Sequence, residues 1–246
     1  MTAKTIGKLA PLHQQAAPLR NKIVTALRSA IETGLLRPGE RLVERNLCEQ
    51  LAVSRTSLRE ALRELQAVGV LTHTENRGLA VVVPTPEDAQ NAYRLRAVVE
   101  ALAVEQFIER ADGADRDQLA ADGLALKKAY LSGSVERILA SKRQFYDCIC
   151  SGAKNGLALD IINRLVLRTS SLRSRSLARK ERQQQSVKEI EAILAGIHRK
   201  DVAAAKAAAT RHVENAARSA LGASVAPKDG AATKVMAKPR NRNTAA

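Results

Sequence analysis

Aromatic residues are scarce in this chain of 246 residues: tryptophan is absent, and the aromatic types together make up 2% of the sequence. Alanine and leucine are abundant instead. Aromatic and β-branched residues are the usual strand formers, whereas alanine and leucine enter a helix at little cost. The composition therefore predicts a mainly α-helical fold with little sheet.

Cysteines are few, and long apolar runs are missing. The chain has three cysteines, Cys48, Cys148 and Cys150, and an odd number without a secretory leader argues against a disulfide framework. No run of about 18 apolar residues exists, so we expect no membrane-spanning segment. Residues 1–20 also lack the continuous apolar stretch of a secretion signal. We therefore expect a cytoplasmic protein with reduced thiols.

Acidic residues are outnumbered by basic ones, 25 against 40, which gives a formal net charge of +15. Such an excess attracts polyanions, and nucleic acid or an anionic membrane surface are the standard partners. An enzyme is disfavoured, because the sequence shows no nucleophile–base pair, no glycine-rich phosphate loop and no set of metal ligands. Its 4 histidines are scattered along the chain.

The N-terminal part of the sequence has helical patterns separated by turn signals, and then the period changes. Apolar residues recur at helical spacing, and short alternating stretches typical of strands follow. The expected elements are a helix from Pro18 to a stop at Gly34, a short helix over Glu44–Leu51, a third helix that ends at Gly69, and strands at Val70–Thr72 and Leu79–Val83. This is the order of a winged helix-turn-helix, which we place at residues 18–83 after a flexible leader at 1–17.

Beyond this unit, the prolines of residues 84–86 break the pattern and predict a short, stiff linker. Residues 87–221 have helical period throughout and predict an all-α bundle of about six helices. We expect these helices near residues 87–111, 115–131, 135–151, 156–178, 181–199 and 201–220. The last stretch, 222–246, has almost no large apolar residue, so we expect a disordered basic tail.

The start of the third helix is the strongest candidate for reading DNA. Leu58 and the apolar residues that follow it at helical spacing fix one side of this helix against the core. The residues left to project from the first turn are Ser54, Arg55, Thr56, Ser57 and Arg59. Arginine can grip guanine in the major groove with two parallel hydrogen bonds, and hydroxyls can bond phosphate oxygens. The alternative is that Ser54, or Ser57 with Glu60 in a capping box, only caps the helix while the arginines form a solvated face.

The sequence also contains a nearly gapless series of motifs: Pro18-Leu19-Arg20, Ile31–Gly34, Pro38–Arg45, Leu51–Leu65, Gly69 and Asn76-Arg77-Gly78. This series resembles the N-terminal domain of the GntR family of bacterial transcriptional regulators. The resemblance implies that DNA is contacted by Arg45, Arg55, Thr56, Ser57 and Arg59. It also implies that the wing tip, Asn76, Arg77 and Gly78, approaches the minor groove. Ser57 stands where the family commonly has proline, a departure that leaves the helix start intact.

The helical region carries Arg96 with Glu100, Phe145-Tyr146, Asn155, and Asp201 before an alanine-rich helix. In order and spacing these residues are similar to the FadR-type (FCD) C-terminal domain of the same family. Many such domains hold a divalent metal through an aspartate, a histidine one turn later, and one histidine on each of two later helices. The matching positions here are Lys142, Tyr146, Ile190 and His212. Only the last is of a ligand type, and since Zn²⁺ or a similar ion needs three or more protein donors, we expect no metal and no other cofactor.

Basic residues within the apolar stripes of the helical region point to a different ligand. The candidates for binding it are Arg96, Lys142, Tyr146, Arg168 and His212. Glu100 is the one acid expected to face inward with them. Because a buried ammonium group is costly unless something negative meets it, these residues predict a pocket for a small anionic effector.

Each of these residues also has a simpler structural interpretation. Lys142 could reach the surface, His212 could be a hydrogen-bonded core residue, and Arg96 could only pair with Glu100 on the next turn. The arginine- and serine-rich stretch Arg164–Arg182 is expected to be a solvated face.

Two classes of function remain open at this point. The leading one is a sequence-specific, effector-controlled repressor or activator that binds double-stranded operator DNA. We expect it to be a homodimer on a palindromic site, because one small winged domain reads only a half-site. The alternative is a basic architectural DNA-binding protein whose helical domain only dimerises. Non-specific binding is almost wholly electrostatic, so a salt-resistant preference for one sequence separates the two classes.

Overall fold

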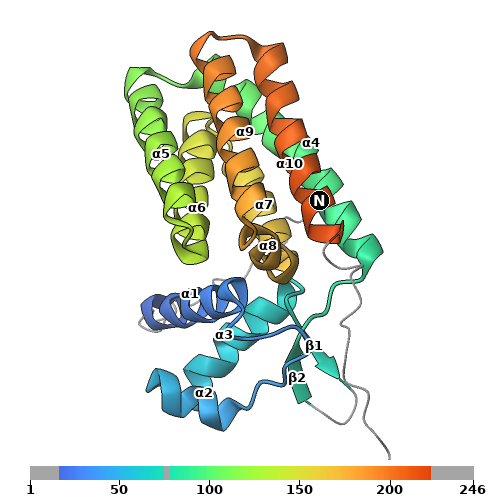
Figure 1. Ribbon diagram of the computed structural model, residues 1–246. Helices are drawn as coiled ribbons and strands as arrows, with labels where there is room; N and C mark the ends of the chain where they lie inside the picture. Colours follow the sequence, from blue (N-terminus) through green and yellow to red (C-terminus); the bar gives the residue numbers. More distant parts are fainter. Residues whose placement is uncertain (1–16, 75–77, 223–246) are drawn as a thin grey trace, which may run out of the picture.

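The computed structural model describes residues 17–74 and 78–222, so nearly all of the expected leader and tail lies outside the described residues. A small N-terminal unit packs against one end of a larger helical bundle (Figure 1). The N-terminal unit comprises α1 (Ala17–Thr33), α2 (Glu44–Leu51), α3 (Arg55–Ala67), β1 (Leu71–Thr74) and β2 (Gly78–Val81). The bundle comprises α4 (Pro86–Arg110), α5 (Gly113–Ser132), α6 (Val135–Gly152), α7 (Gly156–Arg168), α8 (Ser170–Leu177), α9 (Lys180–His198) and α10 (Val202–Gly222). This order confirms the predicted mainly α fold, a winged helix-turn-helix followed by an all-helical domain.

A tight turn joins α2 to α3. Ala52 adopts the left-handed conformation with φ of 51°, which ends α2 and redirects the chain. Ser54 is the N-cap of α3, where its Oγ accepts a hydrogen bond from the backbone N–H of Ser57 at 3.2 Å. This bond satisfies one of the free N–H groups of the first turn. The face of α3 that packs against α1 and α2 buries Leu58, Ala61, Leu62 and Leu65.

β1 and β2 form an antiparallel hairpin beside α3. The segment before α2 extends this hairpin, because the backbone N–H of Leu42 donates to the Leu79 carbonyl at 2.8 Å. Each strand end lies one or two residues from the predicted strands Val70–Thr72 and Leu79–Val83. Side-chain type indicates that strands are present, whereas backbone pairing sets where they end.

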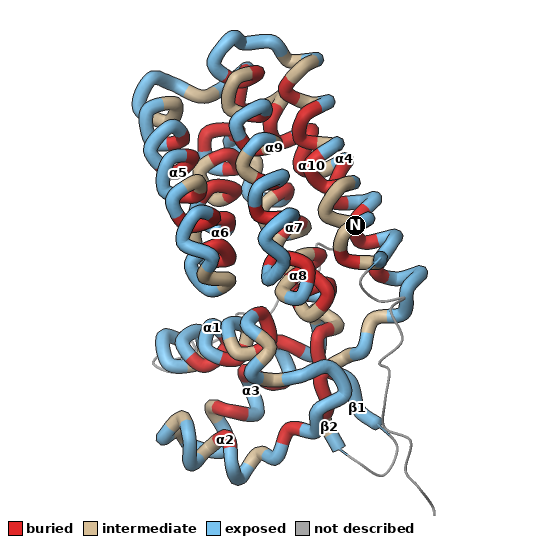
Figure 2. The backbone as a smooth tube through the Cα atoms, in the orientation of Figure 1, coloured by how far each residue is buried: buried red, intermediate tan, exposed pale blue. Residues whose placement is uncertain are grey.

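In the helical bundle, α10 lies between α4 and α9, while α5 packs against α6 and α9 (Figure 1). The buried residues lie on the inward faces of these helices (Figure 2). A Cβ atom on Gly196 of α9 would lie 2.8 Å from the backbone of Ala205 on α10, so this close helix contact requires glycine. Among residues 17–74 and 78–222, none of the helices combines the length and the hydropathy needed to cross a bilayer.

The single helix predicted at 156–178 is two helices, α7 and α8, which meet at Thr169. Thr169 is buried, has φ of −104° and ψ of 10°, and its hydroxyl donates to the Leu165 carbonyl at 3.0 Å. A threonine hydroxyl that bonds to the preceding turn favours a bend in the helix. The helical spacing of apolar residues continues across Thr169, so periodicity alone could not locate the break.

The N-terminal unit contacts α6, α7 and α8 of the bundle. Leu167 of α7 is 1% exposed and belongs to the apolar core of the N-terminal unit. Glu32 near the end of α1 is also buried, and its carboxylate pairs with Arg143 of α6 at 2.5 Å. The carbonyl of Glu32 accepts a hydrogen bond from Ser174 of α8 at 3.0 Å. The two units are therefore joined by apolar packing and by the contacts of Glu32.

Candidate functional site

The first turn of α3 presents the residues predicted to read DNA. Arg55 and Thr56 are exposed there, and Ser57 is half-buried. The Oγ of Ser54 donates to the Oγ of Ser57 at 3.0 Å. Ser54 therefore caps the helix, as one interpretation predicted, whereas a capping box of Ser57 with Glu60 is wrong because Ser57 lies inside the first turn.

Two predicted arginines lie beside this turn, held by acidic neighbours. The Nε of Arg59 donates to Glu44 of α2 at 2.8 Å, yet 60% of the Arg59 side chain remains exposed. Arg45 pairs with Glu49 at 3.0 Å and is 78% exposed. Because exposed ion pairs of this kind are weak, both guanidinium groups can exchange their carboxylates for phosphate or base edges.

A groove of about 420 Å³ runs between α3 and the wing. Its basic lining residues are Arg41, Arg59, Arg63 and His73, with Gly78 at the start of β2. Arg41 and Arg63 were not among the predicted site residues, although Arg63 follows Arg59 by one helical turn and could have been found by that spacing. Gly78 has φ of 74°, a conformation that favours glycine. The predicted wing-tip residues Asn76 and Arg77 lie outside the described residues.

A second group of charged residues lies inside the bundle, and we call it the cationic cluster. Nearly all of its side chains are at least nine-tenths buried. Its members are Arg96 and Glu100 of α4, Lys142 and Tyr146 of α6, Arg173 of α8, Arg182 and Glu189 of α9, and His212 of α10. Arginine and lysine outnumber glutamate in this set, so the cluster carries excess positive charge.

A chain of hydrogen bonds crosses the cationic cluster. The Nζ of Lys142 lies 2.8 Å from Nε2 of His212, and Nδ1 of His212 lies 2.7 Å from Glu189. Arg182 binds Glu189 through two parallel bonds of 3.0 and 2.8 Å. Because a carboxylate only accepts, His212 donates from Nδ1 to Glu189, and its Nε2 is left to accept from Lys142.

Burial and these contacts together shift the pKa values of Lys142, His212 and Glu189. Burial lowers the pKa of Lys142 well below its ordinary value, and Arg173 and Arg96 lower it further. Burial and the charge of Lys142 lower the pKa of His212 to about 3, although its hydrogen bond with Glu189 acts in the opposite direction. Burial alone would raise the pKa of Glu189, but hydrogen bonds from His212 and Arg182 lower it to about 2.

These shifts predict acid destabilisation that begins at mild pH. Below its ordinary pKa of 6.5, His212 binds a proton in the unfolded chain but not in the folded one, so stability falls as the pH falls toward about 3. Glu189 adds a loss in the same direction between 4.5 and about 2. Urea denaturation should show a smaller loss of stability between about pH 7 and about pH 5 in His212→Gln than in the wild type. The exposed-histidine variant His198→Gln should follow the wild type, and equal pH slopes in all three proteins would contradict the assignment.

Arg96 and Glu100 form the most deeply buried ion pair of the described residues, 1% and 0% exposed and 2.7 Å apart. The Arg96 guanidinium lowers the pKa of Glu100 against the raising effect of burial. The predicted pairing of these two residues is therefore present. One carboxylate oxygen of Glu100, the Tyr146 hydroxyl and the Ser186 hydroxyl are buried without a hydrogen-bond partner among the described residues.

The structure places Arg168 outside the cationic cluster, contrary to prediction. Arg168 is the last residue of α7 and is exposed, and its guanidinium lies against Gly69 of the N-terminal unit. Within α7 the inward stripe is formed by Ala158, Ile162 and Leu165, and Arg168 lies on a different face together with the exposed Arg164 one turn earlier. Arg173 and Arg182 enter the cluster instead, so the stretch Arg164–Arg182 is not simply a solvated face. Glu189 was also missed as an inward acid.

The residues at the positions implied for a metal do not fit one. The imidazole nitrogen of His212 that could bind an ion is hydrogen-bonded to Lys142, and Ile190 is buried and has no donor atom. Within the part of the chain that the structure describes, no group of three or more His, Cys, Asp or Glu residues is placed to hold an ion. Lys142 thus uses the imidazole nitrogen that a metal ion would need.

Both the N-terminal unit and the helical bundle match known protein families. Residues 19–81 match the model of bacterial regulatory proteins of the gntR family, and residues 91–215 match the FCD domain. This chain belongs to the GntR family. It is a GntR-family DNA-binding transcriptional regulator whose helical bundle is an FCD domain.

Named relatives agree with the GntR assignment. The HTH-type transcriptional regulator YdhC of Bacillus subtilis (strain 168) is 30% identical over 130 residues, which cover 52% of this chain and 58% of YdhC. The HTH-type transcriptional regulator McbR of Escherichia coli (strain K12) is 29% identical over 142 residues, 58% of this chain and 64% of McbR. The solved structure of McbR aligns with a TM-score of 0.71 at 23% identity, over 80% of this chain and 93% of McbR. The sequence matches thus span less than two thirds of these relatives, and the structural likeness shows a shared fold.

Proposed function

We propose that this GntR-family protein binds a specific operator through α3 and the wing, and that a small anion held by the FCD domain controls the binding. The observation that carries the first part is the exposure of Arg55, Thr56 and Arg59 at the start of α3, beside a groove lined with further arginines. Recognition helices present this end to the major groove. The groove between α3 and the wing would receive the phosphate backbone.

Within that turn, each side chain has a distinct proposed role. Arg55 and Arg59 carry the donors that suit guanine O6 and N7, and Thr56 offers a hydroxyl and a methyl group. The hydroxyl proton of Ser54 is directed to Ser57, so Ser57 is the hydroxyl free to donate to a phosphate oxygen. Arg45 and the wing tip, Asn76, Arg77 and Gly78, remain proposed DNA contacts that rest on the family resemblance.

The composition of the cationic cluster supports an anionic effector. Even with Lys142 neutral, three guanidinium groups stand against the carboxylates of Glu100 and Glu189. Arg173 is buried, with only 8% of its surface exposed, and yet it has no ion-pair partner among the described residues. A carboxylate or phosphate would offset the cost of burying these charges through charge-assisted hydrogen bonds. The buried hydroxyl of Tyr146, which lies beside Glu100, would supply a further donor.

Glu32 offers a physical route from the cluster to the DNA-binding unit. It is bonded by Arg143 and Ser174, and the residue before each of these, Lys142 and Arg173, belongs to the cationic cluster. A ligand that shifts α6 or α8 within the cluster would therefore change the contacts of α1. We propose that effector binding reaches α3 by this route.

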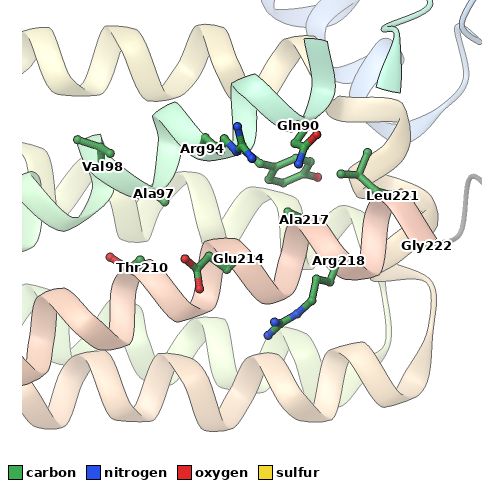
Figure 3. Close-up of a pocket in the computed structure, with 11 residues that line it drawn as sticks. Gln90, Arg94, Ala97, Val98, Thr210, Glu214, Ala217, Arg218, Leu221 and Gly222 are labelled. Carbon is green, nitrogen blue, oxygen red and sulfur yellow. The ribbon is translucent and has the colours of Figure 1, made fainter. Parts of the chain in front are cut away.

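A face of α4 and α10 supports homodimer formation. A hollow of about 920 Å³ lies between these two helices, with Ala97, Val98 and Leu221 among its apolar lining (Figure 3). Arg94 and Glu214 lie in the same hollow and give it charges of both signs, which suit a self-complementary two-fold contact. We propose that a second copy of the chain covers this face.

The test is to sequence the genomic DNA that the purified protein retains, and then to measure binding to the enriched site and to a scrambled site at rising salt. A regulator should prefer the enriched site by about a thousandfold or more at physiological salt. An architectural protein would retain DNA without a common motif and lose it uniformly as salt rises. The effector part is tested by adding organic acids and phosphates to the operator complex. Release by one of them in the wild type but not in Lys142→Met would support it, whereas equal release in both would contradict it.

A further inference from the structure

A polar cavity opens on the surface of the FCD domain where α9 begins and α10 ends. It has a volume of about 480 Å³, within the range of small-molecule sites. All of its lining residues are polar or charged: Arg179, Glu181, Arg182, Gln185, Asn215, Arg218 and Ser219. Ligand sites for apolar molecules are lined mainly by apolar side chains, so this lining selects a small, charged ligand.

The charges of the lining select an anion. The lining holds three arginines and one carboxylate, that of Glu181, and of the arginines Arg182 is paired with Glu189. Among the described residues, neither Arg179 nor Arg218 forms an ion pair. Because Arg179 and Arg218 line the same cavity, their positive charges repel one another, and an anion bound between them reduces that repulsion.

Neutral hydrogen bonds hold the two outer arginines at the cavity. Arg179 donates to the carbonyl of Ser219 and, at 2.7 Å, to its Oγ. Arg218 also lines the hollow between α4 and α10, but its side chain donates to Asn215 and points from α10 to the side away from α4 (Figure 3). Each guanidinium carries five N–H donors in a planar fork, so most donors of both groups remain available for a ligand.

We propose that this cavity binds a compact oxyanion with two or more negative charges, such as a phosphate or a small di- or tricarboxylate. Arg179 and Arg218 bind its oxygens with paired, charge-assisted hydrogen bonds. Arg182 forms the floor of the site. Arg179 and Arg218, the two guanidinium groups of the lining without an ion-pair partner among the described residues, favour a ligand with two negative charges.

This site lies outside the cationic cluster but shares one residue with it. Arg182 lines the cavity and also binds Glu189, the partner of His212. An anion in the cavity competes with Glu189 for Arg182, and this competition links the surface site to the interior. The site does not depend on Lys142, so it stands apart from the proposed effector pocket.

The experiment is isothermal titration of the full-length protein with sodium phosphate and with sodium citrate, at an ionic strength held constant with sodium chloride. The variants are Arg179→Gln, Arg218→Gln and the double variant, and Arg199→Gln at the opposite end of α9 is the matched control. Both anions should bind the wild type and Arg199→Gln alike. Each single variant should raise the Kd by about tenfold, and the double variant by more.

The outcomes separate this proposal from that of the interior effector. Anion binding that persists in Lys142→Met and is lost in the Arg179→Gln/Arg218→Gln double variant supports the surface site. This conclusion holds whether or not the interior effector pocket binds an anion. Binding that is lost in Lys142→Met but unchanged in the double variant would overturn the surface site. Equal weakening by Arg199→Gln and by the cavity variants would also overturn it, because it would show attraction to net charge alone.

Discussion

Arg55→Ala is expected to weaken binding to the operator by about 1–3 kcal/mol, roughly 5- to 150-fold in Kd, with little effect on scrambled DNA. Arg55 is exposed on the first turn of α3, so its removal should leave the fold intact. If Arg55 contacts a guanine, the substitution lowers the affinity for the operator and leaves the affinity for scrambled DNA nearly unchanged. If it met only phosphate, operator and scrambled DNA would weaken together.

Arg59→Ala is expected to act in the same direction, with a second effect on Glu44. Loss of the 2.8 Å contact with Arg59 leaves the Glu44 carboxylate free near the DNA, which adds repulsion to the lost hydrogen bonds. Arg199→Ala, which removes an exposed arginine at the far end of the bundle, controls for net charge. Gel-shift titrations measure the Kd of all three variants for operator DNA and for scrambled DNA. Unchanged discrimination in Arg55→Ala and Arg59→Ala would remove the recognition-helix assignment.

Arg96→Met is expected to destabilise the folded protein by about 3–5 kcal/mol, the largest effect of any single substitution proposed for this chain. The variant leaves the Glu100 carboxylate, 0% exposed, without its ion-pair partner. A buried carboxylate without a partner must either carry its desolvation cost or take up a proton. The measurement is the free energy of unfolding from urea denaturation near neutral pH.

Two further variants show whether the loss of stability in Arg96→Met comes from the unpaired charge of Glu100. Arg96→Met/Glu100→Met removes both charges and should recover most of the stability, because apolar residues often replace a buried ion pair without cost. Lys127→Met breaks the exposed pair with Glu191, 44% and 49% exposed, and should change stability by less than about 1 kcal/mol. A double variant as unstable as Arg96→Met would mean that lost packing, rather than charge, is responsible.

The recognition element could be predicted in detail because its signals are local. The N-cap Ser54, the apolar spacing from Leu58 and the turn before α3 all lie within a few residues of one another. Helix capping and periodicity depend on such neighbours, so the structure agrees with the predicted start of α3. The break at Thr169 escaped prediction because threonine at a helical position is common, and only its buried hydroxyl bond shows the bend.

The cationic cluster could be predicted only in part. Arg96, Lys142 and His212 interrupt apolar stripes, and this pattern marked them as inward residues. Arg173 and Arg182 lie in a stretch dense in arginine, where a solvated face is the usual arrangement, so their burial had no comparable local signal.

The sequence by itself determined the helical composition, the winged N-terminal unit and the membership of the GntR family, and it shows lysine and isoleucine, Lys142 and Ile190, at positions where the family resemblance implies metal ligands. These follow from residue types, spacing and motifs, which do not change with the packing of the helices. Only the tertiary structure decided that Glu189 lies against His212, that Glu32 joins the two units, and that Arg168 faces away from the cluster. Such pairings depend on the rotation and separation of helices that are distant in the chain, and long charged side chains can reach several partners from one backbone position.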